Sequence, residues 1–200
     1  LDFMINATSL ILGHSNSNVA SVVKDQADKG LAFSGPTDSQ VRLAKLLTER
    51  IPSVETIRFT NSGTEGTMMA IRAAREFTGR SKIVKIEGGY HGTHEDVAVS
   101  VYPNKDHLDP IQTAPIPEYS NQPSSVLDNV IVVPYNDIEV TNQMIRAESQ
   151  NISCVIIEPV VSSFGYTPAN VDYLQFVRDI TTEPGIVLIY DDVQSLRVSP

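Results

Sequence analysis

Largely apolar runs without an alternating polar pattern constrain the fold of this chain more than any other feature of its sequence. These predicted strands cover residues 56–60, 83–86, 130–133, 152–157 and 186–190. Continuous apolar strands are typical of a sheet that is buried on both faces. Helix-like segments lie between the strands, at residues 64–78, 137–149 and 170–182. The alternation predicts an α/β fold, a three-layer sandwich in which right-handed crossovers cover a mainly parallel sheet.

The segments outside this pattern set the expected domain division. Two further helices are predicted at residues 19–29 and 39–50. We predict that residues 1–36 form an N-terminal segment, which leads into a large domain at residues 37–200. The proline-rich and polar segment 101–129 is predicted to be a long surface loop.

Charge and cysteine content exclude several classes of function. The formal net charge is -9, without a run of like charges, so attraction to phosphate backbones is disfavoured and no nucleic-acid partner is expected. No apolar stretch approaches the roughly 18 residues that span a bilayer, and the first residues lack a signal-peptide pattern. No membrane partner is therefore expected. Cys154 is the only cysteine and lies in an apolar run, so a buried thiol and a cytoplasmic location are predicted.

The first candidate site is the turn that enters the helix at residues 64–78. Its residues are Asn61, Ser62, Gly63 and Thr64. The unpaired N–H groups at the positive end of the helix dipole would bind a phosphate. Ser62 and Glu65 would also form an ordinary capping box, which stabilises a helix without any ligand. Both interpretations stay open.

The second candidate is the loop Gly88-Gly89-Tyr90-His91-Gly92, which follows the next strand. Its glycines would allow the Tyr90 ring to lie against a flat, conjugated ligand. The alternative is a glycine-rich turn in which Tyr90 and His91 are half-buried. His91 and His94 are too weak a pair to predict a metal site, so no metal is expected.

The third candidate is the pair Asp191 and Asp192, at the end of the last apolar strand. Burial penalises a lone carboxylate unless it has a cationic partner, and a protonated pyridine nitrogen would be such a partner. Alternatively, one aspartate caps the next turn and the other faces water. A phosphate cradle, an aromatic cover and a buried carboxylate could be three parts of one cofactor site.

Longer stretches of the chain resemble one enzyme family. NSGTEGTMMAIRAAREFTGRSKIVKIEGGYHG, IIEPV and VLIYDDVQ resemble the class III aminotransferases, which have the fold called fold type I of pyridoxal-phosphate enzymes. The upstream stretches ILGHSNSNV and FSGPTDSQVRLAKLL resemble the glutamate-1-semialdehyde aminomutase branch of that family. The resemblance covers nearly all of the chain and is loosest at residues 101–129. It implies a fold type I large domain, a pyridoxal 5'-phosphate cofactor, a small-molecule amino acid or amine substrate, and a homodimer.

The same resemblance implies how the first two motifs would hold the cofactor. Gly63 and Thr64, with Ser62 beside them, would bind its phosphate. Tyr90 would stack on its ring, next to His91, and would count among the catalytic residues.

The resemblance also implies roles for residues near the ends of the later strands. Asp191 would pair with the pyridine nitrogen and is the second expected catalytic residue. Val193 would pack on the opposite face of the ring, and Gln194 would lie near the ring hydroxyl. Glu158 matches the Glu-Pro motif of the family and would shape the polar side of the site.

Two departures from the family pattern limit what the resemblance implies. The Schiff-base lysine of the family follows a further strand beyond the position of Gln194, so the large domain is expected to be incomplete at its C-terminus. None of Lys82, Lys85 and Lys105 matches the motif of that lysine. Ser163 stands where the aminomutases have asparagine, so aminomutase, transaminase and racemase-like reactions remain open.

The expected function is the transfer of an amino group between an amino acid or amine and a carbonyl compound, with pyridoxal phosphate as the cofactor. The alternative is a catalytically inactive module that keeps the cofactor-binding fold without the lysine. A dinucleotide-binding oxidoreductase is disfavoured, because no Gly-x-Gly-x-x-Gly pattern follows any predicted strand.

Overall fold

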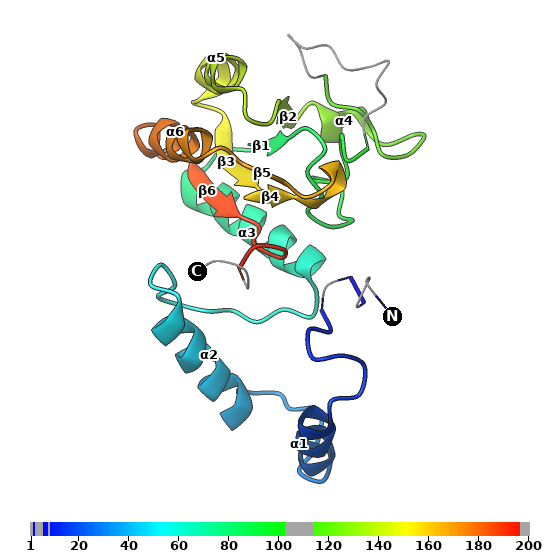
Figure 1. Cartoon of the computed structure of the whole chain (residues 1–200). Helices are drawn as coiled ribbons and strands as arrows, with labels where there is room; N and C mark the ends of the chain where they lie inside the picture. The colour runs from blue at the N-terminus through cyan, green and yellow to red at the C-terminus, as the bar shows by residue number, and fades with distance from the viewer. Residues whose placement is uncertain (1, 3–5, 8, 103–113, 197–200) are drawn as a thin grey trace. The chain divides into compact units, whose positions relative to one another are not determined.

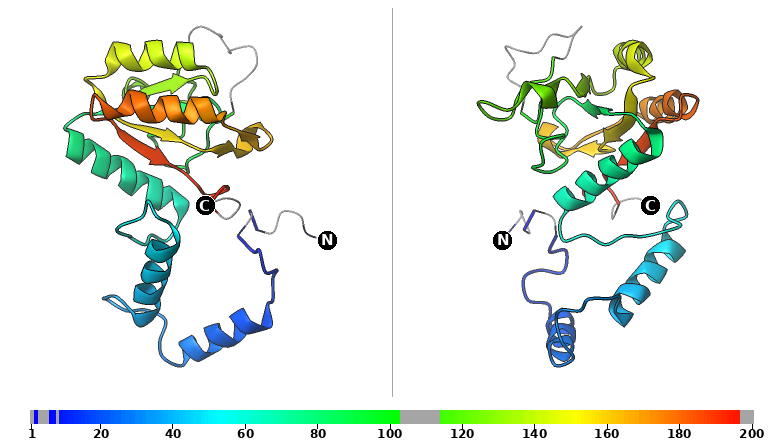
Figure 2. Two further views of the ribbon diagram at one scale, coloured as in Figure 1. Left: turned by 60° about the vertical axis from the view of Figure 1, so that its left-hand side comes forward. Right: turned by 180° about the vertical axis from the view of Figure 1, so that it is seen from behind.

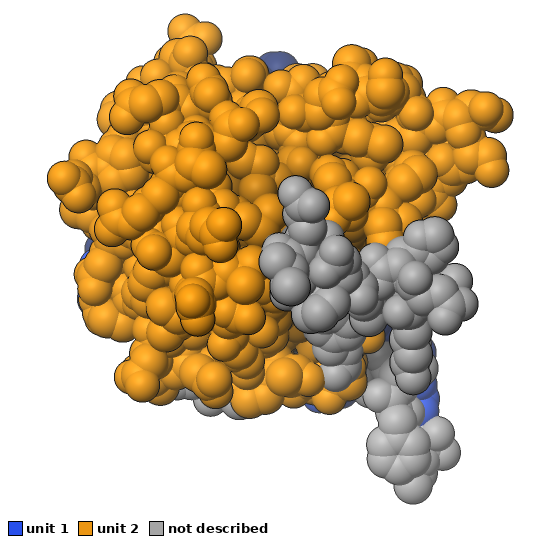
Figure 3. Space-filling model, turned by 90° about the horizontal axis from the view of Figure 1, so that it is seen from above, with its two compact units in different colours: residues 1–58 blue, residues 59–200 orange. Residues whose placement is uncertain are grey.

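The chain divides into two compact units, residues 1–58 and 59–200, which Figure 3 colours separately. The structure is a computed structural model, and it describes residues 2, 6–7, 9–102 and 114–196. The proposed boundary between residues 36 and 37 stays a prediction.

A parallel sheet of four strands forms the centre of the second unit (Figure 1). Its strands are β1 (Lys82–Ile86), β2 (Val130–Val133), β3 (Ile152–Ile157) and β6 (Val187–Tyr190), in the order β2-β1-β3-β6. All the pairings are parallel, and every residue of β3 is buried. The predicted α/β fold is confirmed.

Helices cover both faces of this sheet, as Figure 2 shows. One face carries α3 (Gly63–Thr78), and the other carries α5 (Ile138–Glu148) and α6 (Val171–Thr182). Each interface has its own buried core. The arrangement is the predicted three-layer sandwich.

Side chains along the strands alternate between these two cores, as the pleat of a β-strand requires. The core on the α3 side includes Ile83, Cys154, Ile156 and the half-buried Val187 and Ile189. The core on the opposite side includes Val84, Ile86, Val155, Ile157 and the half-buried Leu188. Burial raises the pKa of the Cys154 thiol to about 11, which keeps it neutral and confirms the prediction of a buried thiol.

The start of α3 differs in detail from the predicted capping box. The Ser62 hydroxyl oxygen accepts a hydrogen bond from the Glu65 N–H at 3.1 Å, as predicted. The Glu65 carboxylate, however, accepts from the backbone and side-chain nitrogens of Asn61, at 2.8 and 3.1 Å, instead of from Ser62. Only half of the box is formed.

The predicted strand at residues 56–60 is wrong. These residues have no regular secondary structure, because they pair with no strand in the part of the chain that the structure describes. The predicted loop at residues 101–129 contains the short helix α4 (Ser124–Leu127), and its residues 103–113 lie outside the described part.

Three short elements after β3 were not predicted. A two-stranded hairpin joins β4 (Val160–Val161) to β5 (Thr167–Pro168), with the 3-10 helix η2 (Ser162–Phe164) between them. Two or three residues are too few to show a hydrophobic period, so no pattern in the sequence could indicate them.

The first unit contains two helices, α1 (Ser17–Ala27) and α2 (Asp38–Arg50). The side chain of Asn16 caps α1, and Thr37 forms a complete capping box with Gln40 at the start of α2. Neither helix has a buried residue. Among the described residues of both units, no helix has the length and apolar character needed to cross a membrane.

The loop after β1 packs closely on the first turns of α3. The Thr67 hydroxyl donates to the His91 carbonyl at 2.6 Å, and the Thr93 N–H donates to the Thr64 hydroxyl oxygen at 3.3 Å. Gly92 has a φ of +106°, and a Cβ added there would lie 2.6 Å from the Thr64 hydroxyl oxygen and 2.8 Å from the Thr64 Cα. Only glycine allows this close approach.

The buried strand positions should dominate stability. Ile156→Ala is expected to lower the free energy of unfolding by about 2–5 kcal/mol, because it leaves a cavity in the core on the α3 side. The control is Val171→Ala in α6, because the Val171 side chain is 80% exposed whereas that of Ile156 is 0% exposed. It should change stability by no more than about 0.5 kcal/mol. Urea denaturation measures both, and equal losses would contradict the assigned core.

Gly92→Ala should be more harmful than a glycine substitution that meets no neighbour. Gly185 also has a positive φ, of +66°, but nothing lies within 4 Å of a Cβ added there. Gly92→Ala is therefore expected to cost about 1–3 kcal/mol more stability than Gly185→Ala, because the Thr64 backbone must shift. Urea denaturation of the two variants is the measurement. Similar losses would show that the loop does not depend on this contact.

Candidate functional site

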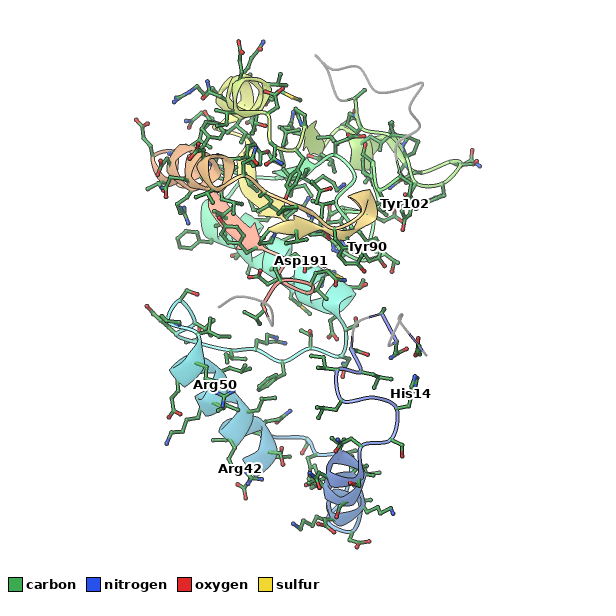
Figure 4. The ribbon with its side chains drawn as sticks, viewed as in Figure 1. His14, Arg42, Arg50, Tyr90, Tyr102 and Asp191 are labelled. Carbon is green, nitrogen blue, oxygen red and sulfur yellow. The ribbon has the colours of Figure 1, made fainter. Side chains whose placement is uncertain are left out.

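Polar side chains meet at the C-terminal edge of the sheet, where Figure 4 labels Tyr90 and Asp191. His91, in the loop after β1, lies 3.0 Å from Asp191, which follows β6; the distance joins Nδ1 to Oδ2. His91 is 1% exposed, and the Asp191 side chain is 13% exposed. Residues 100 positions apart in the sequence are therefore in direct contact.

Burial fixes the protonation state of His91. It lowers the pKa of the imidazole, and the hydrogen bond to the Asp191 carboxylate opposes this effect without being the larger cause. The ring is therefore neutral, and the contact assigns its proton to Nδ1, which donates to the Asp191 carboxylate. Nε2 has no hydrogen-bond partner among the described residues.

Glu158 lies at the end of β3 beside this pair and is 1% exposed. Its Oε2 accepts from the Ser162 N–H at 3.3 Å, and the Tyr90 N–H is a further donor to its carboxyl group. No described residue bonds to its Oε1. Burial raises the pKa of Glu158 to about 7, and the charge of Asp191 adds to the effect. Donor atoms of His91, Glu158 and Asp191 all lie within 4.8 Å of one another.

Sequence reasoning did not place two buried residues at this site: Glu87 was not considered, and Lys85 was considered only as the Schiff-base lysine. Lys85 is 0% exposed, and its Nζ donates to the carbonyls of Val99 at 2.7 Å and Ile86 at 3.1 Å. Burial lowers the pKa of Lys85 to about 8, against the opposing charges of Glu87 and Glu158. Burial also raises the pKa of the Glu87 carboxyl group. The available signal was two ionisable residues at alternate positions, 85 and 87, in and just after an apolar strand.

The candidate phosphate residues lie at the N-terminus of α3. Ser62 is the N-cap, and Gly63 and Thr64 begin the helix, where N–H groups lack helical partners. A Cβ added to Gly63 would meet nothing within 4 Å, so there is open space beside this backbone. The contacts of Thr64 and Thr67 with the loop at residues 91–93 join this helix end to the His91 side of the site.

The remaining candidates are more exposed. Tyr90 is 40% exposed and lines a cavity of about 230 Å³, together with Thr93, Val101 and Tyr119. Val193 is 54% exposed, and Gln194 is half-buried in the turn after β6. The structure brings His91, Glu158 and Asp191 together, and the roles of all the candidate site residues stay predictions.

The two aspartates at the end of β6 differ in their partners. Asp191 contacts His91, and its Oδ1 also accepts from the Val193 N–H at 3.4 Å. Asp192 bonds to the Ser195 hydroxyl in the following turn. The pairing of Asp191 with a buried imidazole orients its carboxylate.

Comparisons with known proteins show the family of this chain. The family described as aminotransferase class-III matches residues 1–195. The glutamate-1-semialdehyde 2,1-aminomutase of Methanothermobacter thermautotrophicus is 39% identical over all of this chain and 46% of its own length. That of Methanococcus maripaludis is 40% identical over 96% of this chain and 44% of its own length.

Solved structures of transaminases and aminomutases are also similar to this chain. An omega-transaminase from Sphaerobacter thermophilus superposes with a TM-score of 0.91 and is 44% identical, over 98% of this chain and 45% of its own. A glutamate-1-semialdehyde aminomutase from Pseudomonas aeruginosa, 22% identical over 95% of this chain and 40% of its own, shares the fold with a TM-score of 0.79. The chain spans less than half the length of these relatives. With a family match over nearly its whole length, the chain belongs to the class III aminotransferase family.

Proposed function

We propose that the protein transfers an amino group between an amino acid or amine and a carbonyl compound, with pyridoxal phosphate as its cofactor. The observation that carries this proposal is the buried His91–Asp191 pair at 3.0 Å, at the carboxyl edge of a parallel sheet. Ligands of such sheets bind at this edge. A neutral imidazole that donates to Asp191 leaves the carboxylate oriented and able to accept from a cationic ring nitrogen.

The residues of the chain fit this cofactor at its two ends. The first turn of α3 offers N–H groups and the positive end of a helix dipole, which suit a phosphate group. Open space beside Gly63 leaves room for it. Tyr90 offers a partly exposed ring for stacking on a heterocycle. When bound, pyridoxal phosphate supplies an electron sink for the breaking of a bond at the substrate carbon.

The protein's contribution would be binding, orientation and control of protons. Asp191 would hold a proton on the ring nitrogen, and His91 would fix the direction of the Asp191 carboxylate. Val193 and Gln194, in the turn after β6, would contact the ring from the other side.

The relatives support this proposal in both of its forms. Several are named aminomutases, and a solved relative that is 36% identical, with a TM-score of 0.91, is described as a transaminase with PLP bound. Ser163, in η2, stands where the resemblance to the family implies an asparagine in aminomutases. We therefore propose an amino-group transfer that is either a transamination or an aminomutase reaction.

Cofactor binding tests the site directly. Asp191→Ala and Gly63→Asp should each weaken the binding of pyridoxal phosphate at least about tenfold, because one removes the partner of the ring nitrogen and the other places a charge beside the phosphate. The control is Asp192→Ala, which removes a neighbouring carboxylate that bonds to Ser195. Titration followed by absorbance measures all three. An unchanged affinity for either test variant would contradict the assigned site.

The same samples test the alternative that the protein is a catalytically inactive module without the Schiff-base lysine. Borohydride reduction followed by intact mass separates a cofactor held covalently at a lysine from one held without a covalent bond. A reduced adduct at one lysine supports an enzyme, and its absence with retained binding supports the module.

We also propose that the protein is a cytoplasmic homodimer. The buried, neutral thiol of Cys154 suits a reducing compartment. Exposed apolar side chains on α1, such as Val19 and Val22 at 50% and 66%, support a further interface. Light scattering on the full chain should give twice the mass of one chain, and a monomer mass at micromolar concentration would contradict the dimer.

A further inference from the structure

The register of the sheet aligns three carboxyl groups in a row. Lys85 pairs with Ile156, so Glu87, two residues further along β1, comes beside Glu158 at the end of β3. Ile157 pairs with Tyr190, so Glu158 in turn comes beside Asp191. Neighbouring strands are about 4.7–4.9 Å apart, so the backbones of the three residues follow one another in this order just beyond the carboxyl ends of the strands.

The pleat places all three carboxyl groups on the same face. Ile83 on β1, Ile156 on β3 and Ile189 on β6 belong to the core on the α3 side. Residues an even number of positions further along share that face, which includes Glu87, Glu158 and Asp191. We call these three residues the carboxylate row. Glu87 is 6% exposed and Glu158 is 1% exposed, so water screens neither of them well.

Few positive charges among the described residues lie near the carboxylate row to balance three ionised carboxyl groups. Lys85 is the buried cation on this face, and its two hydrogen bonds go to backbone carbonyls, not to a carboxylate. His91 is neutral and donates its Nδ1 proton to Asp191. Glu158 lies in the middle, between two other carboxyl groups, and its buried Oε1 has no partner among the described residues. Atoms of Glu158 and Asp191 lie within 4.8 Å of one another, and the charge of Asp191 raises the pKa of Glu158, so a second negative charge on the buried Glu158 costs free energy.

We infer that Glu158 is a positioning residue that acts as a neutral carboxylic acid, so that Asp191 is the anionic member of the carboxylate row that faces the cofactor. Only the last part of this inference rests on the proposed function. The protonation of Glu158 is inferred from its burial beside Asp191 at the carboxyl edge of the sheet, so it concerns the protein without its cofactor.

Two effects favour the neutral form of Glu158, and they outweigh the groups that favour its ionised form. Burial is the main reason why its pKa is raised to about 7, the Ser162 N–H from η2 opposes it, and Asp191 after β6 adds to it. The Tyr90 N–H and the Lys85 ammonium also oppose it, as smaller causes. The Tyr135 hydroxyl donates to the Glu158 backbone carbonyl at 3.2 Å, and not to its carboxyl group.

The first test is the stability of the full chain without cofactor, as a function of pH. The folded pKa of Glu158 is raised above the unfolded value of about 4.5, so the unfolded state releases this proton first and stability is lost as pH rises from about 4.5 to 7. Relative to Glu158→Gln, the folding constant of the wild type should fall by up to about tenfold per pH unit in this window. The exposed control Glu76→Gln should follow the wild type at every pH.

The second test detects the proton itself by infrared spectroscopy of the cofactor-free protein. The wild type should show a protonated-carboxyl band at pH 6 that Glu158→Gln lacks. Asp191→Asn should lower the pH at which this band disappears, because it removes a negative neighbour, and Lys85→Met should raise it, because it removes a cation. If Lys85→Met does not fold, the shift in Asp191→Asn decides alone. A protonated-carboxyl spectrum at pH 6 that Glu158→Gln leaves unchanged in intensity would overturn the inference.

The third test connects Glu158 to the cofactor through pyridoxal phosphate labelled with ¹⁵N in its ring. The nitrogen resonance should show a protonated ring in the wild type and in Glu158→Gln, and an unprotonated ring in Asp191→Asn. A ring that loses its proton in Glu158→Gln would mean that Glu158 acts as an anion, and would overturn its assigned role. If the cofactor binds to no variant, the proposed function fails, while the first two tests still decide the protonation of Glu158.

Discussion

The parallel register of β1, β3 and β6 is the constraint on which the candidate site depends. Because all these strands run in one direction, Glu87, Glu158 and Asp191 emerge at the same edge, from positions 71 and 33 residues apart in the sequence. The strands themselves are fixed by burial on both faces, with α3 on one side and α5 and α6 on the other. A site built on the ends of such strands is held as firmly as the core.

The buried ionisable groups at this edge of the sheet lower the stability of the fold. An apolar side chain in place of Lys85 or Glu158 would avoid the desolvation of a charge, and the directions of their pKa shifts record that cost. Proteins retain such groups where a ligand needs a defined field. These groups influence one another: the charges of Asp191 and Lys85 act on the pKa values of both His91 and Glu158, and Lys85 also acts on that of Glu87.

The fold was largely predictable from the sequence, because the runs at residues 130–133 and 152–157 have both the length and the apolar character of buried strands. Those two strands occur with the predicted bounds. The prediction of a strand at residues 56–60 was wrong, since apolar character cannot reveal whether a neighbouring strand exists to pair with. The motifs at Tyr90–His91 and Asp191 were visible, but the contact between His91 and Asp191 was not, because only the three-dimensional fold joins residues so far apart. Lys85 was set aside because it does not match the motif of the Schiff-base lysine, and its burial beside the site became visible only in the fold.

The tight packing of Gly92 on Thr64 links the two halves of the site mechanically. The loop that carries Tyr90 and His91 begins at the end of β1 and is held to α3 by the Thr67 and Thr93 hydrogen bonds. A ligand held at the α3 N-terminus and at Asp191 would therefore contact elements that are already joined without it. Little conformational entropy would then be lost on binding, which is the physical advantage of a preorganised site.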